Sequence, residues 1–153
     1  MSDILIQLFN PIDAEAVTRL WRESMQAAIG IPPVHSFDSH QYFLSHILPT
    51  DHEIRVALIN EEPVGFIAFN AKFVSQLYIK IGYQGKGIGK QLLHLAKDSA
   101  IDGLQLRTFE VNEGAQRFYE RHGFVCIGGD DQNEEGLMDR LYEWKKQNSS
   151  LCL

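Results

Sequence analysis

The sequence predicts a mixed α/β domain of the α+β type, and three observations lead to this fold class. The chain has 153 residues, 44% of them hydrophobic and 22% charged, which is the length and balance of one globular domain. Short runs rich in Val, Ile and Phe alternate with longer segments whose apolar residues recur every three or four positions. No internal repeat interrupts this order. We therefore expect a single domain over residues 1–145 and a disordered polar tail over 146–153.

The first half of the chain is expected to form four strands and two helices. Residues 4–9 predict a strand, which Asn10 and Pro11 end. A helix should then run from the cap residue Asp13 to Gly30, and a second helix should cover 39–48. Two β-rich runs on either side of the polar stretch 60–62 predict a hairpin, and residues 73–81 predict the next strand of that meander.

The second half is expected to add two helices and three strands. From Ile88 the apolar pattern takes the helical period, so we expect a helix that ends at about residue 102, where Gly103 stops it. Residues 104–110 predict a strand, and a helix capped by Asn112 and closed by Gly123 should follow. Strands at 124–129 and 137–144, separated by the acidic loop 130–135, complete a predicted set of seven strands and four helices.

Charge and cysteine content narrow the classes of function. The formal net charge is −6, which would repel a nucleic-acid backbone or an anionic membrane surface, so we expect neither as a partner. Cys126 and Cys152 are too few for a disulfide framework and indicate free thiols in a reducing compartment. No run of about 18 apolar residues occurs, so we expect a cytoplasmic protein without a membrane anchor.

A glycine-rich turn, GYQGKGIGKQLL at residues 82–93, lies between a predicted strand and a predicted helix. Glycine allows positive φ, so successive amide groups can point inward at an anion, and the helix N-terminus adds partial positive charge. Lys86 and Lys90 strengthen this local field, and phosphate is the expected guest. The spacing matches neither a P-loop, since Gln91 stands where Ser or Thr is required, nor a dinucleotide fingerprint, since the glycines follow a hairpin meander.

Two blocks of the sequence together resemble the GNAT superfamily of acyl-CoA-dependent N-acetyltransferases. QGKGIG, residues 84–89, fits the family signature Gln/Arg-x-x-Gly-x-Gly/Ala at the expected place before a helix. NEGAQRFYERHGF, residues 112–124, resembles the second hallmark of the family. The predicted element order also matches, so the resemblance extends over nearly the whole chain. It implies a mostly antiparallel central sheet that is splayed at its central strands.

The resemblance also implies a binding mode for acetyl-CoA. The amides of the turn would hold the pyrophosphate, and free main-chain groups of the preceding strand would bind the pantetheine arm, with Asn112 capping its helix or contacting that arm. The expected cofactor-binding residues are Leu77, Tyr78, Ile79, Gln84, Gly85, Lys86, Gly87, Ile88, Gly89, Lys90 and Asn112.

The resemblance assigns Tyr119 as the general acid that protonates the departing thiolate. Phenol and thiol have reference pKa values of about 10 and about 8.5, so a donated hydrogen bond or proton is chemically reasonable. The residues alone leave a second interpretation open, because Tyr119 shares its helical face with Ala115, Phe118 and His122 and could be a core tyrosine.

The catalytic base stays open at this stage. An alkylammonium acceptor with a pKa of about 10.4 is neutral only to roughly one part in a few thousand at pH 7. Many family members carry a carboxylate on the central strand, whereas this chain has Gln76 at the nearest position, which cannot accept a proton. The weak candidates for the base are Glu53, Glu110, His35 and His52, acting directly or through a water.

The expected function is transfer of an acetyl group from acetyl-CoA to a primary amine of a small molecule, peptide or protein. The acidic loop 130–135 lies where the family often shapes the acceptor pocket or a dimer contact, and it would suit a cationic amine, although acids in a loop between strands usually form only a solvated turn. His40, His46 and His94 have no ligand-like spacing, so no metal site is expected. A non-catalytic acyl-CoA sensor on the same fold is the alternative, favoured by the missing carboxylate at Gln76, and a homodimer is possible.

Overall fold

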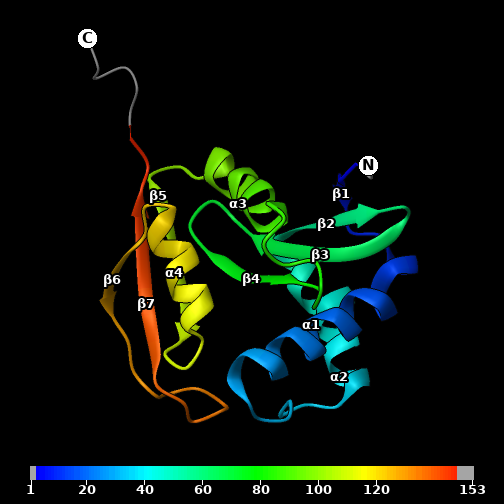
Figure 1. Ribbon diagram of the computed structural model, residues 1–153, viewed down its shortest axis with the longest axis horizontal. Helices are drawn as coiled ribbons and strands as arrows, with labels where there is room; N and C mark the ends of the chain where they lie inside the picture. The colour runs from blue at the N-terminus through cyan, green and yellow to red at the C-terminus, as the bar shows by residue number, and fades with distance from the viewer. Residues whose placement is uncertain (1–2, 148–153) are drawn as a thin grey trace.

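The structure, a computed structural model, describes residues 3–147, and its elements follow the predicted order (Figure 1). The strands are β1 (Leu5–Leu8), β2 (Glu53–Ile59), β3 (Glu62–Phe69), β4 (Val74–Ile79), β5 (Gly103–Phe109), β6 (Val125–Gly128) and β7 (Asp139–Lys145). The helices are α1 (Ala14–Ile29), α2 (Phe37–Tyr42), α3 (Ile88–Ser99) and α4 (Glu113–Arg121), with short helical turns η1 (Pro11–Asp13), η2 (Phe43–Ile47) and η3 (Leu48–Thr50). The predicted fold class is confirmed.

The seven strands form two sheets that meet at one point. The first sheet has the order β1-β2-β3-β4 and the second β5-β7-β6, and every named strand pair is antiparallel. A single parallel bridge joins Phe73 to Gln105, whose amide donates to the Lys72 carbonyl at 2.9 Å. Ser75 is an extra residue in β4, because Ala68 pairs with Gln76 and Phe69 with Val74. Past this bulge β4 and β5 have no ladder between them, which is the predicted splay.

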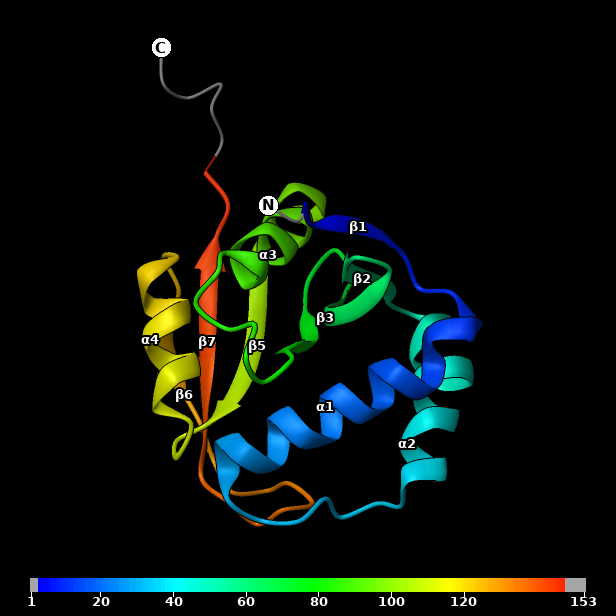
Figure 2. The ribbon, with the colours of Figure 1, turned by 45° about the vertical axis from the view of Figure 1, so that its right-hand side comes forward.

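Helices cover both faces of the first sheet. α1 and α2 pack on one face and α3 on the other, while α4 lies against the second sheet (Figures 1 and 2). One core cluster, which includes Ile67, Leu92, Leu104 and Tyr142, joins α3 and α4 to the two sheets. A second cluster, around Trp21, joins α1 and α2 to the first sheet.

At two helix ends, the residue expected to cap or stop the helix does not do so. Asp13 stands at the N-cap position of α1, but its side chain caps nothing; the side chain of Asn10 accepts from the Ile12 amide at 3.0 Å and caps η1 instead. Gly103 does not stop a helix. α3 already ends at Ser99, and Gly103 begins β5, where an added Cβ would lie 2.2 Å from the Trp144 carbonyl oxygen. A side chain has no room at this strand crossing, which is why glycine stands there.

The other helix ends agree with the sequence. Gly30 closes α1 in the left-handed conformation at φ 78°, Asn112 caps α4, and Gly123 follows α4 with φ 90°. The second predicted helix begins earlier, because Ser36 caps α2 through the Ser39 amide, and helical turns continue to Thr50. Of the predicted tail, residues 148–153, including Cys152, lie outside the described residues, whereas the Lys146 amide donates to Asp102 at 2.9 Å.

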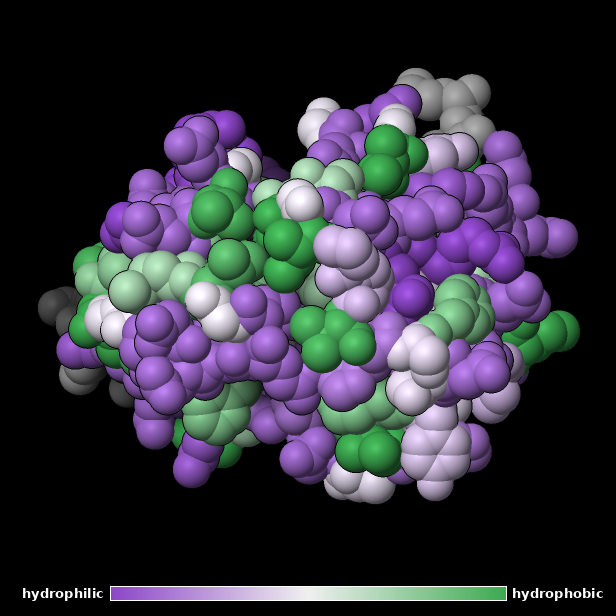
Figure 3. All heavy atoms as spheres, turned by 90° about the horizontal axis from the view of Figure 1, so that it is seen from below, coloured by the Kyte–Doolittle hydropathy of each residue, from purple (hydrophilic) through white to green (hydrophobic). Residues whose placement is uncertain are grey.

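One face of the domain mixes polar and apolar side chains. Seen from below, hydrophobic side chains are scattered among hydrophilic ones (Figure 3). Within residues 3–147, no helix combines the length and the apolar character needed to cross a membrane.

Candidate active site

The glycine turn between β4 and α3 has the backbone of an anion site. Gly85 and Gly87 have φ values of 76° and 85°, in the left-handed region that glycine adopts without strain. Gly87 is also the N-cap of α3, and no side chain caps the amides of the first turn. Added Cβ atoms at Gly85 and Gly87 would meet nothing within 4 Å, so the space in front of the turn is open. Amides of this kind suit a phosphate group.

The third glycine of the turn has another purpose. Gly89 lies inside α3 with ordinary helical geometry, and an added Cβ would come within 3.3 Å of the Phe118 ring on α4. It therefore allows α3 and α4 to approach each other closely. The sequence treats the three glycines alike, and only the packing separates this one from the other two.

Side chains around the turn supply positive charge and fix its position. Lys86 extends over the ring of Tyr83, 5.9 Å from the centroid, and Lys90 is exposed in the first turn of α3. Gln84 donates from Nε2 to the Ile79 carbonyl at 3.2 Å, which ties the turn to the end of β4. The turn residues named from the sequence are thus brought together at one helix N-terminus, and they fit the pyrophosphate of coenzyme A.

At the end of β4, a main-chain group that the resemblance assigned to ligand binding is already hydrogen-bonded within the protein. The Ile79 carbonyl already accepts hydrogen bonds from Gln84 and, at 2.8 Å, from the Ser24 hydroxyl on α1. Main-chain groups of Leu77 and Tyr78 therefore remain the better candidates for contact with a pantetheine arm. The sequence did not single out Ser24, although a serine on the apolar face of a predicted helix is a signal that a buried partner is needed.

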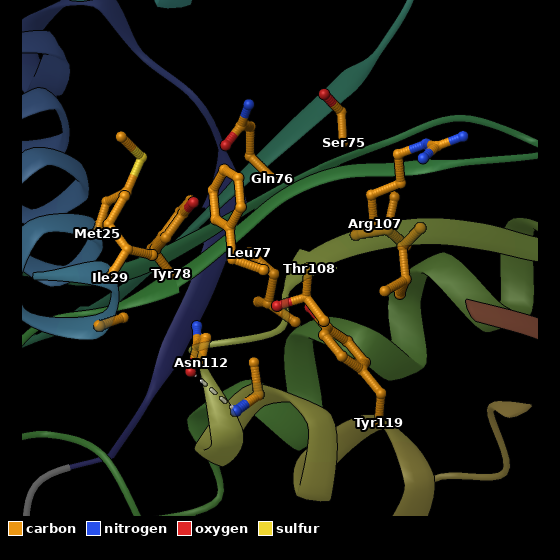
Figure 4. Close-up of a pocket in the computed structure, with 15 residues that line it drawn as sticks. Met25, Ile29, Ser75, Gln76, Leu77, Tyr78, Arg107, Thr108, Asn112 and Tyr119 are labelled. Atoms are coloured by element: carbon orange, nitrogen blue, oxygen red, sulfur yellow. Dashed lines mark hydrogen bonds between the residues drawn. The ribbon is translucent and has the colours of Figure 1, made fainter. Parts of the chain in front are cut away.

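A cavity of about 70 Å³ lies in the splay between β4 and β5 (Figure 4). α1 and α4 close it on either side. Its lining comprises Met25, Ala28, Ile29, Val74, Ser75, Gln76, Leu77, Tyr78, Leu106, Arg107, Thr108, Phe109, Asn112, Ala115 and Tyr119. Leu77, Tyr78, Asn112 and Tyr119, which the sequence placed in one site, are therefore together here.

Tyr119 extends from α4 into this cavity toward Thr108 (Figure 4). The residue is only 7% exposed, yet its hydroxyl makes no hydrogen bond to any described residue. Burial, with a smaller contribution from Tyr78, raises the pKa of Tyr119, so the phenol keeps its proton at neutral pH. A buried hydroxyl without a partner, facing a cavity, is ready to donate to a bound group.

Tyr78 lies on the other side of the cavity, beside Met25 and Ile29 of α1 (Figure 4). Burial and the negative charge of Glu135 raise the pKa of Tyr78 to about 12, while an interaction with Trp21 opposes the shift. Its hydroxyl is therefore a neutral hydrogen-bonding group as well. The sequence assigned only main-chain contacts to Tyr78 and missed its side chain, because the direction of a strand side chain depends on the bulge at Ser75.

Asn112 can serve both of the roles that the sequence left open, helix cap and contact with the pantetheine arm. Its Oδ1 accepts from the Ala115 amide at 3.1 Å, so it caps α4, and it also lines the cavity. The cap leaves the amide nitrogen of the side chain available to a ligand.

None of the four weak candidates for the catalytic base lines the cavity. His52 and Glu53 border a separate surface depression, where His52 pairs with Asp51 and Glu53 with Arg55. His35 is exposed and contacts Glu134 at 2.5 Å.

Glu110 is the candidate nearest to the cavity in the chain, one residue after Phe109, and it is exposed. It lies 3.6 Å from a guanidinium nitrogen of Arg140. The cavity itself is lined by amide, hydroxyl and phenol groups and by Arg107, whose guanidinium binds Asp139 at 3.0 Å. No carboxylate and no histidine is among its lining residues.

Comparison with known proteins identifies the family. Residues 50–126 match the acetyltransferase (GNAT) domain. Over 141 residues the chain is 30% identical to the peptidyl-lysine N-acetyltransferase YjaB of Salmonella typhimurium, a match that covers 85% of this chain and 92% of that protein. The chain belongs to the GNAT acetyltransferase family, and it is an N-acetyltransferase that transfers an acetyl group from acetyl-CoA to an amine.

Two further similarities agree with this assignment. A spermine/spermidine N(1)-acetyltransferase of Bacillus subtilis is 38% identical over 71 residues, covering 43% of this chain and 47% of that protein. A PaiA N-acetyltransferase from Thermoplasma acidophilum, solved in complex with coenzyme A, shares the fold with a TM-score of 0.72 at 24% identity, over 94% of this chain and 99% of that one. Among the described residues, no three His, Cys, Asp or Glu side chains form a group that could hold a metal ion.

Proposed function

We propose that this chain acetylates a primary amine carried on a flexible alkyl chain, as in a lysine side chain of a peptide or in a polyamine. Both acceptor types appear in the names of its relatives. The observation that carries the proposal is the cavity in the splay, which the unbonded hydroxyl of the buried Tyr119 faces. A cytoplasmic location and a homodimer stay predictions.

The donor side is proposed to use the amides of residues 85–90 for the pyrophosphate, with Lys86 and Lys90 adding charge. Main-chain groups of Leu77 and Tyr78, and the free amide nitrogen of Asn112, would bind the pantetheine arm. Acetyl-CoA supplies the thioester when it is bound. The chain itself supplies the positioning, because groups from β4 and α4 converge on one cavity.

Tyr119 is proposed to assist the departure of the thiolate. A buried phenol is a weaker acid than a thiol, so complete proton transfer to the thiolate is uphill at equilibrium. Tyr119 therefore acts by donating a hydrogen bond as negative charge develops on sulfur, and the proton that the attacking amine loses replaces any proton that is transferred.

A variant of Tyr119 tests the proposal. Tyr119→Phe removes one oxygen atom from a packed ring, so we expect kcat to fall about 100-fold while coenzyme A affinity stays within twofold. Thiol release from acetyl-CoA with spermidine or an N-terminally blocked lysine peptide measures kcat, and titration calorimetry measures affinity. Tyr142→Phe is the matched control, because Tyr142 is buried, donates to Glu120 at 2.8 Å and does not line the cavity. An unchanged kcat for Tyr119→Phe would contradict the proposed role.

The second candidate function is a non-catalytic acyl-CoA sensor, and one observation favours it. The cavity lining contains no carboxylate or histidine that could take the proton of an ammonium group. In the enzyme, a water in contact with bulk solvent must carry that proton away. The sensor predicts that the unaltered protein binds coenzyme A tightly and that no amine raises thiol release above hydrolysis.

A further inference from the structure

The carbonyl of Ile79, at the end of β4, accepts hydrogen bonds from two separate parts of the molecule. One donor is the hydroxyl of Ser24 on α1, at 2.8 Å, and the other is Nε2 of Gln84 in the glycine turn, at 3.2 Å. A carbonyl oxygen has two lone pairs, so it can accept from both donors at once. The end of β4 therefore connects α1 with the turn that is proposed to hold the pyrophosphate.

One hydrogen bond ties the first residues of the turn to the strand. In residues 3–147, the bond from Gln84 is the only hydrogen bond that joins residues 84–86 to β4. Gly85 and Gly87 follow with φ values of 76° and 85°, and glycine has more conformational freedom than any other residue. The direction of the turn amides thus depends on the oxygen that Gln84 binds.

Ser24 fixes this oxygen from the side of α1. The residue is only 5% exposed, and its neighbour Met25 and, further along the helix, Ile29 line the cavity (Figure 4). The side chain of Ile79 lies beside α3, because a Cβ added at Gly89 would come within 3.9 Å of it. Ile79 is therefore held between the cavity wall that α1 forms and the first turn of α3.

We propose that Ser24 is a positioning residue for coenzyme A, because it holds the Ile79 carbonyl where Gln84 of the turn can bind to it. This role rests on the proposed cofactor site, which it deepens. Ser24 does not line the cavity, so it acts through Ile79. Its hydroxyl limits the freedom of the turn before the cofactor arrives, and a preformed site loses less entropy on binding. Removal of the hydroxyl should therefore weaken cofactor binding and leave the chemical step almost unchanged.

Titration calorimetry with coenzyme A tests this role. Ser24→Ala should raise the dissociation constant about fivefold, the effect of one lost hydrogen bond. Gln84→Met, which keeps the length of the side chain without its amide, should raise it by a similar factor. The double variant should raise it no more than about tenfold, less than the product of the single effects, because both donors act on one oxygen. In steady-state kinetics, Ser24→Ala should raise KM for acetyl-CoA and change kcat less than twofold.

Thr18→Val is the matched control. Thr18 is buried on the same helix, its hydroxyl has no hydrogen-bond partner in residues 3–147, and it does not line the cavity. The dissociation constant of this variant should stay within twofold of the value for the unaltered protein. An equal rise for Thr18→Val and Ser24→Ala would overturn the role of Ser24, because any hydroxyl lost from this helix would then explain the effect. Fully multiplicative effects of Ser24→Ala and Gln84→Met would overturn it as well.

Gly87→Ala separates the role of Ser24 from that of the turn itself. If Gly87→Ala weakens coenzyme A binding and Ser24→Ala does not, only the role of Ser24 is overturned. If neither substitution weakens binding, the turn is not the cofactor site, and the role of Ser24 fails with it. Calorimetry needs no turnover, so a protein that acetylates neither amine would overturn the proposed function while the dissociation constants still decide the role of Ser24.

Discussion

At the scale of single residues, glycine stands in this chain for three different physical reasons. Gly87 needs positive φ and has open space around it. Gly89 has ordinary φ, but α4 packs directly against it. Gly103 has no room for a side chain because the Trp144 carbonyl of the neighbouring strand lies in the way. Replacing glycine by alanine should therefore change the free energy of unfolding by a different amount at each site, and the change need not have the same sign.

The first prediction at this scale compares Gly103 with Gly114. Gly103→Ala would place its Cβ 2.2 Å from the Trp144 carbonyl oxygen, so β5 and β7 must shift apart, and we expect a loss of about 2 to 3 kcal/mol of unfolding free energy. Gly114→Ala, within α4, meets nothing closer than 3.9 Å and should gain up to about 1 kcal/mol. Urea unfolding of the two variants without ligand measures both values. A loss in Gly103→Ala no larger than 0.5 kcal/mol would contradict this reason for glycine at the crossing.

Some residues of the candidate site could be predicted from their neighbours in the sequence, and others could not. The turn residues and Asn112 could be predicted, because a helix N-terminus and a cap depend on neighbours in the chain. Ser24 and the side chain of Tyr78 could not, because α1 meets β4 across a sequence separation of 55 residues, from Ser24 to Ile79.

At the scale of elements, the periodic pattern predicted all seven strands and four helices, and the exceptions are at their ends. α3 was expected to reach residue 102, yet it ends at Ser99, because Ala100 is buried in extended conformation and the chain must turn there toward the second sheet. Helix ends of this kind are decided by tertiary packing. The parallel bridge from Phe73 to Gln105 is equally invisible in the sequence, since it joins two separate sheets.

The contact of α1 with α2 predicts a pH dependence of stability. His40 on α2 is 6% exposed and stacks on Trp21 of α1 at 4.3 Å between ring centroids. Burial, with the positive charge of Arg22 and the neighbouring His35, lowers the pKa of His40 to about 4, and Glu134 opposes this shift. The folded state therefore binds fewer protons than the unfolded state between pH 6.5 and pH 4. Stability is highest above this window and falls as the pH falls through it, by at most about 3 kcal/mol from this group.

Urea unfolding between pH 7 and pH 4 checks this expectation. His40→Gln should show a smaller fall in unfolding free energy over the window than the unaltered protein, whatever its stability at pH 7. His46→Gln, which removes an exposed histidine from the next helical turn, is the control and should follow the unaltered protein. Parallel curves for all three proteins would show that His40 does not carry the effect.

At the scale of the whole molecule, one bridge is the only strand pairing between the two sheets in residues 3–147, and the candidate site occupies the gap beyond it. β4 and α3 belong to the first sheet and its helix layer, whereas Asn112 and Tyr119 follow the first strand of the second sheet. A ligand bound to both groups would connect the halves of the domain. The net charge of −6 opposes an anionic ligand at long range, so binding depends on the local field of the turn.

Coenzyme A should therefore stabilise the folded domain as a whole. At a free concentration of about 100 times its dissociation constant, coenzyme A should add about 2.7 kcal/mol to the free energy of unfolding and raise the melting temperature by about 5 to 10 °C.

Gly87→Ala forces an alanine to φ 85° and disturbs the amides that face the ligand, so most of this rise should disappear. Gly30→Ala imposes comparable backbone strain at φ 78°, also with open space around it, but lies outside the turn. It should melt at a lower temperature without ligand and keep the full rise. A full rise in both variants would show that the turn does not bind the cofactor, because the two substitutions impose similar backbone strain and only Gly87 lies in the turn.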